Sequence, residues 1–208
     1  MAAKCWILDV RPLAVKSQFE KALCALAWPE RREKALAYAH PSDRLLSLGA
    51  GLVCAQALRD FGAQDLRLAC GAHGKPYLVS YPDIHFSIAH SGHIALCAVS
   101  DSPIGADVEK PRPYPARVAA RCLQSEELAF AEQADDPARA FARLWTRKES
   151  VLKRSGEGLS RSMAEFSVWP DAPDSLFFDE TEKEGHLLCV CRSGASPTEW
   201  IEWSPEFV

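Results

Sequence analysis

The 208-residue sequence lacks several features that mark special classes of protein. No segment approaches the apolar run of about 18 residues that a transmembrane helix needs, and the first ten residues hold no stretch of signal-peptide length. Basic runs, low-complexity segments and internal repeats are also missing, and the net charge is −4. We therefore expect neither a membrane protein nor a nucleic-acid-binding protein.

Paired cysteine motifs are missing too, although the chain has eight cysteines. They are scattered and mostly lie within apolar segments, which predicts reduced, buried thiols in a cytoplasmic protein. His186, Cys189 and Cys191 lie close together in the sequence. They share one strand-like segment without a second pair of ligands, so we interpret them as packing residues and not as a metal site.

What remains is ordinary globular material, 48% hydrophobic and 25% charged, enough for a substantial core in one large domain or two small ones. Helical periodicity and cap residues predict helices at 17–28, from 29 onward, and at 42–61, 118–133 and 137–154. Short apolar or alternating runs predict strands at 4–10, 66–70, 84–90, 94–100, 104–109, 164–169, 175–178, 187–191 and 200–203. This mixture predicts an α+β fold, with the strands after residue 158 backing the second half.

The helix at 137–154 carries the first charged candidates. Pro137 suits its first turn and Gly156 its end. Glu149 and Lys153 are four residues apart, so they share one face of the helix, one turn beyond Trp145. Such a pair taken alone is most often a surface ion pair, which stabilises a helix by only about 0.3–0.5 kcal/mol.

A second acidic group lies upstream, on the strand at 104–109. Asp107 and Glu109 alternate along this strand, so their Cβ atoms lie on one side, roughly 7 Å apart. On an exposed edge strand they would simply be solvated, but the apolar run at 94–100 argues against full exposure. With Glu149 they would form an all-oxygen site, which suits a hard cation such as Mg²⁺.

The two groups together resemble a known signature. Gly105-Ala-Asp-Val-Glu109, followed after 35 residues by Trp145-Thr-Arg-Lys-Glu-Ser-Val-Leu-Lys153, resembles the paired motifs of the 4′-phosphopantetheinyl transferases of the long, surfactin-synthetase-activating type. The resemblance covers most of the chain. It implies a monomer of two similar α+β halves, 1–103 and 104–208, related by a pseudo-twofold axis with the active site between them.

The resemblance also assigns basic residues to the nucleotide end of coenzyme A: Arg31, Lys34, Arg44, Lys75 and His90. Without it, the charges at 31, 34 and 75 would be taken as solvated and the histidine as a hydrogen-bonded core residue. Ala89 stands where the family has a serine, so no phosphate contact is expected there. The glycines at 49 and 51, inside a predicted helix, require either close packing or room for a ligand.

The implied reaction moves 4′-phosphopantetheine from coenzyme A to a serine hydroxyl of an apo acyl or peptidyl carrier protein and releases adenosine 3′,5′-bisphosphate. Asp107, Glu109 and Glu149 would hold Mg²⁺, and Lys153 would neutralise the phosphates. Either Glu149 or a metal-bound water would accept the serine proton. The role of Lys148 stays open at this point. Glu127 resembles a glutamate of a family Ser-x-x-Glu motif, with Gln124 in place of the serine, and it is either an additional site residue or, as is more usual for such a residue, simply solvated.

Two other functions fit part of this pattern. A Mg²⁺-dependent hydrolase of a nucleotide pyrophosphate would use the same residues with water in place of the serine. A non-catalytic module that binds coenzyme A or a carrier protein would keep the basic residues but tolerate loss of Asp107 and Glu149. Neither function predicts both motifs together.

Overall fold

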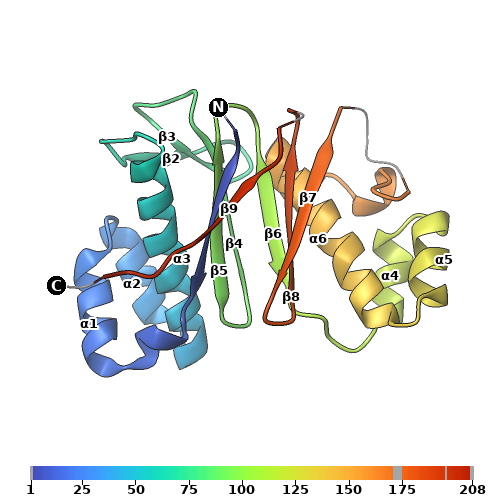
Figure 1. The fold of residues 1–208 in the computed structure, drawn as a ribbon, viewed down its shortest axis with the longest axis horizontal. Coiled ribbons are helices and arrows are strands. Elements are labelled where there is room, and N and C mark those ends of the chain that lie inside the picture. The colour runs from blue at the N-terminus through green and yellow to red at the C-terminus, as the bar shows by residue number, and fades with distance from the viewer. Residues whose placement is uncertain (1, 171–174, 195, 207–208) are drawn as a thin grey trace.

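The computed structural model describes residues 2–170, 175–194 and 196–206. Its strands lie in the middle of the molecule and its helices on the two outer sides (Figure 1). The first sheet has the order β4 (His85–Ser91), β5 (Ile94–Ser100), β1 (Lys4–Asp9) and β9 (Glu199–Glu202), and the second β6 (Gly105–Glu109), β8 (His186–Arg192) and β7 (Phe177–Lys183). A small ribbon pairs β2 (Leu68–Cys70) with β3 (Pro76–Leu78). The predicted α+β class is confirmed.

Helix α3 (Pro41–Asp60) packs on the first sheet, and α1 (Lys16–Ala25) and α2 (Pro29–Ala37) pack on α3. Helix α3 begins after His40 and not at the predicted cap Ser42, because Pro41 takes the first-turn position. A Cβ at Gly49 would overlap Val10, and one at Gly51 would crowd Leu26 and the Arg31 side chain. Close packing therefore accounts for both glycines.

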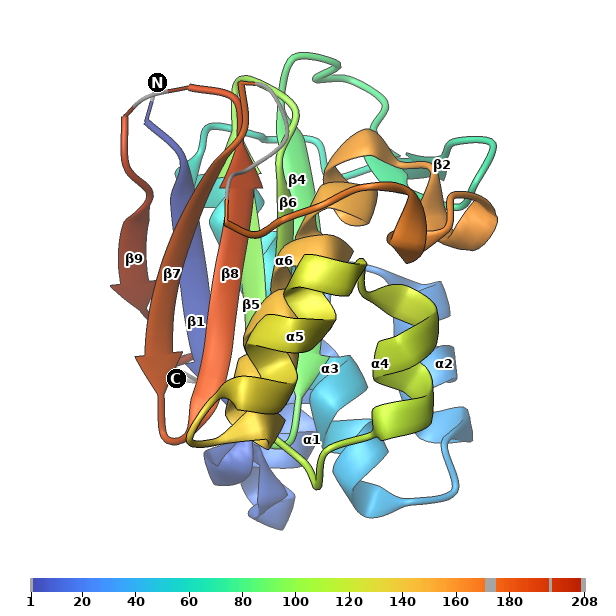
Figure 2. The ribbon, with the colours of Figure 1, turned by 90° about the vertical axis from the view of Figure 1, so that its right-hand side faces the viewer.

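The second sheet packs against α6 (Pro137–Ser155), which carries α5 (Ser125–Gln133) and α4 (Ala116–Cys122) on its outer side (Figure 2). Helix α6 is as predicted: the Asp136 side chain accepts the Arg139 N–H at its start, and Gly156 ends it with φ 76°. The prediction of one helix over 118–133 is wrong. The chain breaks between α4 and α5 because Gln124 and Glu127 form a capping box there.

Two predictions for the later strands are also wrong. The segment at 164–169 is not a strand but begins with a 3₁₀ turn, η3 (Met163–Glu165), because side chains and not a neighbouring strand bind its backbone. Lys148 donates to the carbonyls of Met163 and Phe166, and Val168 N donates to Glu127. The last strand, β9, does not back the second half; it pairs in parallel with β1.

The remaining short elements are η1 (Arg11–Ala14) and η2 (Gly158–Ser160). None of the helices in the described ranges has the length and apolar composition needed to span a membrane. All eight cysteines are free, and those at 5, 54, 97, 189 and 191 are buried, as expected of packing residues. The prediction of buried thiols is wrong for Cys24 and Cys70, which are exposed, and Cys122 is half-buried. The pseudo-twofold relation and the division at residue 104 stay predictions, with β9 crossing that division.

An apolar layer joins the two sheets. Its buried side chains come mainly from β1, β4, β5, β6 and β8 and from Ile104, the residue before β6. The larger ones are Ile7, Ile94, Leu96, Ile104, Val108, Leu188 and Val190. Edge strands β4 and β6 lie next to each other across this junction. The charged residues singled out from the sequence gather beside it.

Candidate active site

Strand β6 and helix α6 touch through their backbones at Gly105. A Cβ at this position would overlap the carbonyl oxygen of Ser150 and the backbone of Arg154, so the strand and helix approach this closely only with glycine. The approach brings the two sequence motifs together: Lys153 Nζ lies 2.6 Å from Asp107 Oδ1.

Asp107 is the most buried of the predicted carboxylates, with 5% of its surface exposed. Its Oδ2 is buried and has no hydrogen-bond partner within the described part of the chain. Burial raises the pKa of Asp107 to about 7, although the positive charge of Lys153 lowers it. The negative charges of Glu149 and Glu109 raise this pKa by smaller amounts. Burial also raises the pKa of Glu149. The three carboxylates thus share one electrostatic environment in which negative charge is poorly compensated.

These carboxylates are suitable donors for a hard cation. The unpartnered Asp107 Oδ2 and the raised pKa values of Asp107 and Glu149 indicate a place where a positive charge would stabilise the ionised groups. Their ligand atoms do not all lie within 4.8 Å of one another, as those of Asp9, His93 and Glu184 do. Lys153 instead holds one oxygen of Asp107.

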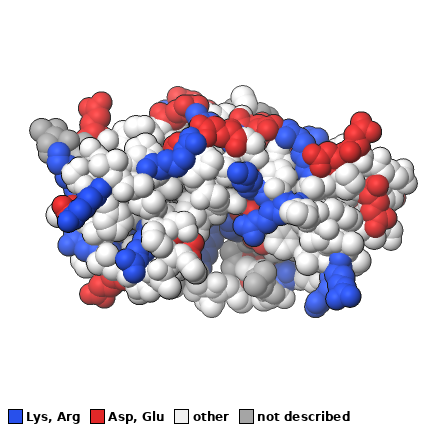
Figure 3. All heavy atoms as spheres, turned by 90° about the horizontal axis from the view of Figure 1, so that it is seen from below, with Lys and Arg blue, Asp and Glu red and all other residues white. Residues whose placement is uncertain are grey.

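The basic candidates lie beside the same junction. His90 is exposed as a residue, but the packing around its ring removes water and lowers its pKa. The positive charges of Arg31, Lys153 and Lys34 lower this pKa further. Arg31 and Lys34 line a cavity of ≈ 880 Å³ together with Trp28. A hollow with basic and acidic side chains around it lies near the middle of the surface seen from below (Figure 3).

Lys75 connects this region to α6. It lines a smaller cavity of ≈ 240 Å³ together with Lys153, and both cavities share Gly74 and Pro76. The Lys75 ammonium donates to the carbonyls of Ile104 (3.2 Å) and Arg154 (3.0 Å), and burial lowers its pKa to about 8. It therefore caps the last turn of α6 in this structure.

The structure does not bring Arg44 into this group. Its Nε donates to the carbonyl of Tyr38 (2.7 Å), at the start of α3, and it is not among the residues that line either cavity. The other candidates lie beside the junction between the two sheets. They are the basic residues Arg31, Lys34, Lys75 and His90 and the acidic triad with Lys153.

The structure also corrects the interpretation of Glu127 and gives Lys148 a place. Glu127 is not solvated: it is 0% exposed, and its Oε2 lies 2.8 Å from Lys148 Nζ, which is equally buried. Sequence reasoning missed this pair because the predicted helix at 118–133 placed Glu127 in mid-helix, and spacing within one helix does not indicate a partner on another helix. The Lys148 ammonium lies on the α4–α5 side of α6, away from the Lys153 contact with Asp107.

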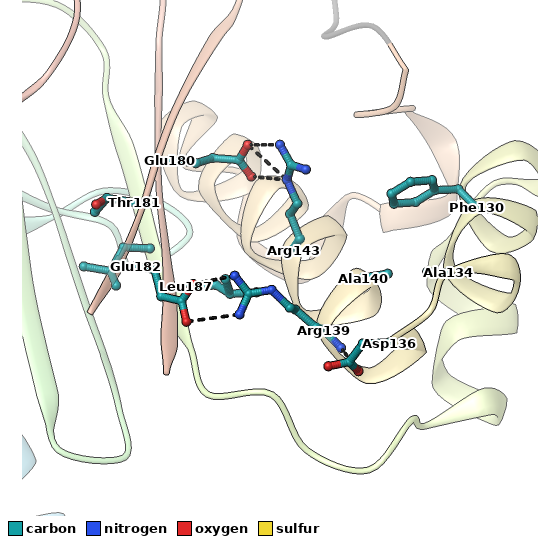
Figure 4. A pocket seen from close by; sticks show the side chains of 11 residues that line it. Phe130, Ala134, Asp136, Arg139, Ala140, Arg143, Glu180, Thr181, Glu182 and Leu187 are labelled. Atoms are coloured by element: carbon teal, nitrogen blue, oxygen red, sulfur yellow. Dashed lines mark hydrogen bonds and ion pairs between the residues drawn. The ribbon is translucent and has the colours of Figure 1, made fainter. Parts of the chain in front are cut away.

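Another cavity, of ≈ 450 Å³, is lined by residues of α5, α6, β7 and β8 (Figure 4). Its charges are paired with each other: Arg143 with Glu180 at 2.7 Å, and Arg139 with Glu182. None of the residues predicted for the site lines it, so it is separate from the carboxylate cluster.

Comparison with known proteins decides the family. A family model described as the 4′-phosphopantetheinyl transferase superfamily matches residues 103–197. The chain is 36% identical over 195 residues to a 4′-phosphopantetheinyl transferase of Bacillus subtilis, which covers 91% of this chain and 85% of the relative. The chain belongs to the 4′-phosphopantetheinyl transferase superfamily.

Further relatives agree with this assignment. The 4′-phosphopantetheinyl transferase Sfp of Bacillus subtilis strain 168 is 37% identical over 180 residues, 78% of this chain and 80% of that protein. AcpT of Salmonella typhi is 33% identical over 129 residues, 58% of this chain and 64% of that protein. The resemblance drawn from the motifs is confirmed, and the protein is an enzyme of the transferase class, in a family that uses coenzyme A and acts on carrier proteins.

Proposed function

We propose that this transferase moves the 4′-phosphopantetheine arm of coenzyme A to a serine hydroxyl of an apo carrier protein, in a Mg²⁺-dependent reaction that releases adenosine 3′,5′-bisphosphate. The observation that carries the proposal is the contact between Lys153 and Asp107. The charges of Glu149 and Glu109 also act on Asp107, and Lys153 acts on His90 together with Arg31 and Lys34. A pyrophosphate bound there would face both groups.

The nucleotide end of coenzyme A suits the cavity of ≈ 880 Å³, where Arg31 and Lys34 would bind its phosphates. Lys75 lines the neighbouring cavity together with Lys153, and His90 lies close enough to Arg31, Lys34 and Lys153 to respond to their charges. We propose that His90 and Lys75 contact the same ligand. Arg44 would act on the nucleotide only if it released the Tyr38 carbonyl.

We propose that Asp107, Glu109 and Glu149 hold Mg²⁺. When bound, Mg²⁺ supplies Lewis-acid stabilisation of charge on the pyrophosphate oxygens. Lys153 neutralises charge on the same oxygens, and its ammonium then exchanges the Asp107 carboxylate for the phosphate. After that exchange, both carboxylate oxygens of Asp107 are available to bind the cation.

In the chemical step, a bond forms between the serine oxygen and the phosphorus of the pantetheine phosphate, and the bond from that phosphorus to the bridging oxygen breaks. The bridging oxygen leaves with adenosine 3′,5′-bisphosphate. Glu149 is the residue of this chain that we assign to accept the serine proton, since burial raises its pKa towards the working pH. The remaining residues act by positioning and charge neutralisation.

We further propose that the enzyme is cytoplasmic and monomeric, binds neither nucleic acid nor membranes, and folds as halves 1–103 and 104–208. The cavity and the carboxylates come from different parts of one chain, and this supports the monomeric state because a single chain then completes the site.

The test is the intact mass of an apo acyl carrier protein and an apo peptidyl carrier protein after incubation with the enzyme, coenzyme A and Mg²⁺. We expect a gain of one phosphopantetheine arm, lost with EDTA and lowered about 10²-fold or more in rate by Glu149→Gln. Glu126→Gln, an exposed carboxylate on α5, is the matched control and should keep the wild-type rate.

Circular dichroism of each variant separates loss of chemistry from loss of fold. Cleavage of coenzyme A without a mass gain on either carrier would favour the hydrolase. Binding of coenzyme A without any turnover would favour the non-catalytic module. A mass gain that persists in EDTA would refute the metal dependence.

A further inference from the structure

The edges of the two sheets meet at β4 and β6, and serine side chains connect them. These strands belong to different sheets, so they are not ladder partners. Ser87 and Ser91 lie four residues apart on β4 and therefore on one side of the strand, the side that also carries Ala89 into the apolar layer between the sheets. Both serines are buried.

The two serines make different contacts. Ser87 Oγ accepts the N–H of Ala106 (2.9 Å) and lies 3.5 Å from the carbonyl of the same residue, so it binds only backbone of β6. Ser91 Oγ accepts the N–H of Lys110 (3.3 Å) and lies 3.0 Å from Glu109 Oε2. Because the lone pair of Ser91 faces an N–H group, its single proton is directed to the Glu109 carboxylate.

We propose that Ser91 is a positioning residue: it orients the carboxylate of Glu109 for cation binding and ties it to the nucleotide side of the site. The inference rests on the proposed function, because it takes Glu109 to be a ligand of the cation. Ser91 itself touches neither substrate nor cation in this account; it acts through Glu109.

The position of Ser91 on its strand supports a coupling role. Neighbouring residues of a strand point to opposite sides, so Ser91 faces β6 while His90 faces the basic region of Arg31 and Lys34. A shift of β4 on ligand binding would move both residues together. Glu109 is half-exposed on the last position of β6, and an untethered glutamate there has several rotamers to choose from.

Ser91→Ala removes the hydroxyl that orients Glu109, and Ser87→Ala is the matched control. Both changes delete one buried hydroxyl from the same side of β4, but only the first touches a carboxylate. The readouts are Mn²⁺ affinity by electron paramagnetic resonance of the free ion, without coenzyme A, thermal unfolding, and steady-state transfer of the arm.

We expect Ser91→Ala to weaken Mn²⁺ binding about 10-fold, the lower end of what loss of an outer-shell partner costs at metal sites. Its kcat should fall while KM for coenzyme A stays within about twofold, because the basic cavity is untouched. Ser87→Ala should lower the unfolding temperature to a similar extent and keep the wild-type Mn²⁺ affinity.

Equal Mn²⁺ affinities of Ser91→Ala and wild type would overturn the inference, as would equal weakening by both variants, which would indicate a general loosening of the junction. These results are separable from failure of the proposed function. If the proposed function fails, the wild type itself does not transfer the arm. If only the inference about Ser91 fails, the wild type transfers the arm and Ser91→Ala binds Mn²⁺ as the wild type does or no more weakly than Ser87→Ala.

Discussion

Lys148 lies within the second motif, next to Glu149, yet its ammonium is buried on the opposite side of α6. Its Nζ contacts Glu127 Oε2 (2.8 Å) and the carbonyls of Met163 (2.8 Å) and Phe166 (2.5 Å). These contacts join α6, α5 and η3 around one positive charge. We predict that Lys148 stabilises the fold and does not contact substrate, and that Lys148→Met, which keeps the apolar stem, tests this.

The expected cost follows from the burial of both partners. Each is 0% exposed, so the variant leaves the Glu127 carboxylate with its N–H donors but no counter-charge. Breaking a buried ion pair from one side typically costs about 3–5 kcal/mol, a large part of the roughly 5–15 kcal/mol by which a domain is stable. At about 2–4 °C per kcal/mol for a chain of this size, the unfolding temperature should fall by about 6–20 °C.

The assay is urea unfolding followed by circular dichroism for wild type, Lys148→Met, Glu127→Gln and the double variant. The double variant should lose less than the sum of the single variants, because it leaves no uncompensated charge. Lys16→Met, on the exposed side of α1, is the control and should stay within about 0.5 kcal/mol of wild type.

Transfer activity decides between support of the fold and contact with substrate. Measured well below its unfolding temperature, Lys148→Met should keep most of the wild-type rate. A variant as stable as wild type but without activity would refute the reasoning and place Lys148 in the catalytic machinery.

Other residues give further predictions. Gly105→Ala should lower the free energy of unfolding in urea by about 1–3 kcal/mol or more and slow transfer, because its methyl group would push α6 away. Asp107→Asn should abolish transfer but raise the urea midpoint at pH 8. Burial raises the pKa of this carboxyl to about 7, so its ionised form destabilises the metal-free fold above that pH. The increase in urea midpoint should therefore shrink towards pH 5. Burial lowers the pKa of His186, so wild type should lose stability as the pH falls below the ordinary value of about 6.5, and His186→Gln should show a smaller loss in the same titration.

Local periodicity predicted the parts of the site that depend on one element. Glu149 and Lys153 share a helix face at four-residue spacing, and Asp107 and Glu109 alternate along a strand; the structure has α6 and β6 where these patterns require them. The glycine that lets the strand touch the helix is part of the same motif. Such features are visible in a sequence because the spacing of residues determines them.

Contacts between distant segments could not be predicted in this way. Nothing in the spacing of β9 indicates that it pairs with β1 at the other end of the chain. The alternation at 164–169 suggested a strand, but the backbone there is bound by Lys148 and Glu127, whose own partnership spans two helices. A strand pattern states only that backbone groups need partners, and not which partners they find.

The location of the site at the junction follows from these long-range contacts. Lys75, from the first half, donates to carbonyls at the start of β6 and at the end of α6, so one ammonium holds the strand of Asp107 and the helix of Lys153 together. Ser91, from the same half, holds the Glu109 carboxylate. The second half contains all three carboxylates, but residues of the first half hold the two elements that carry them, β6 and α6. A second half separated from the first would therefore keep its motifs and lose the geometry that makes them a site.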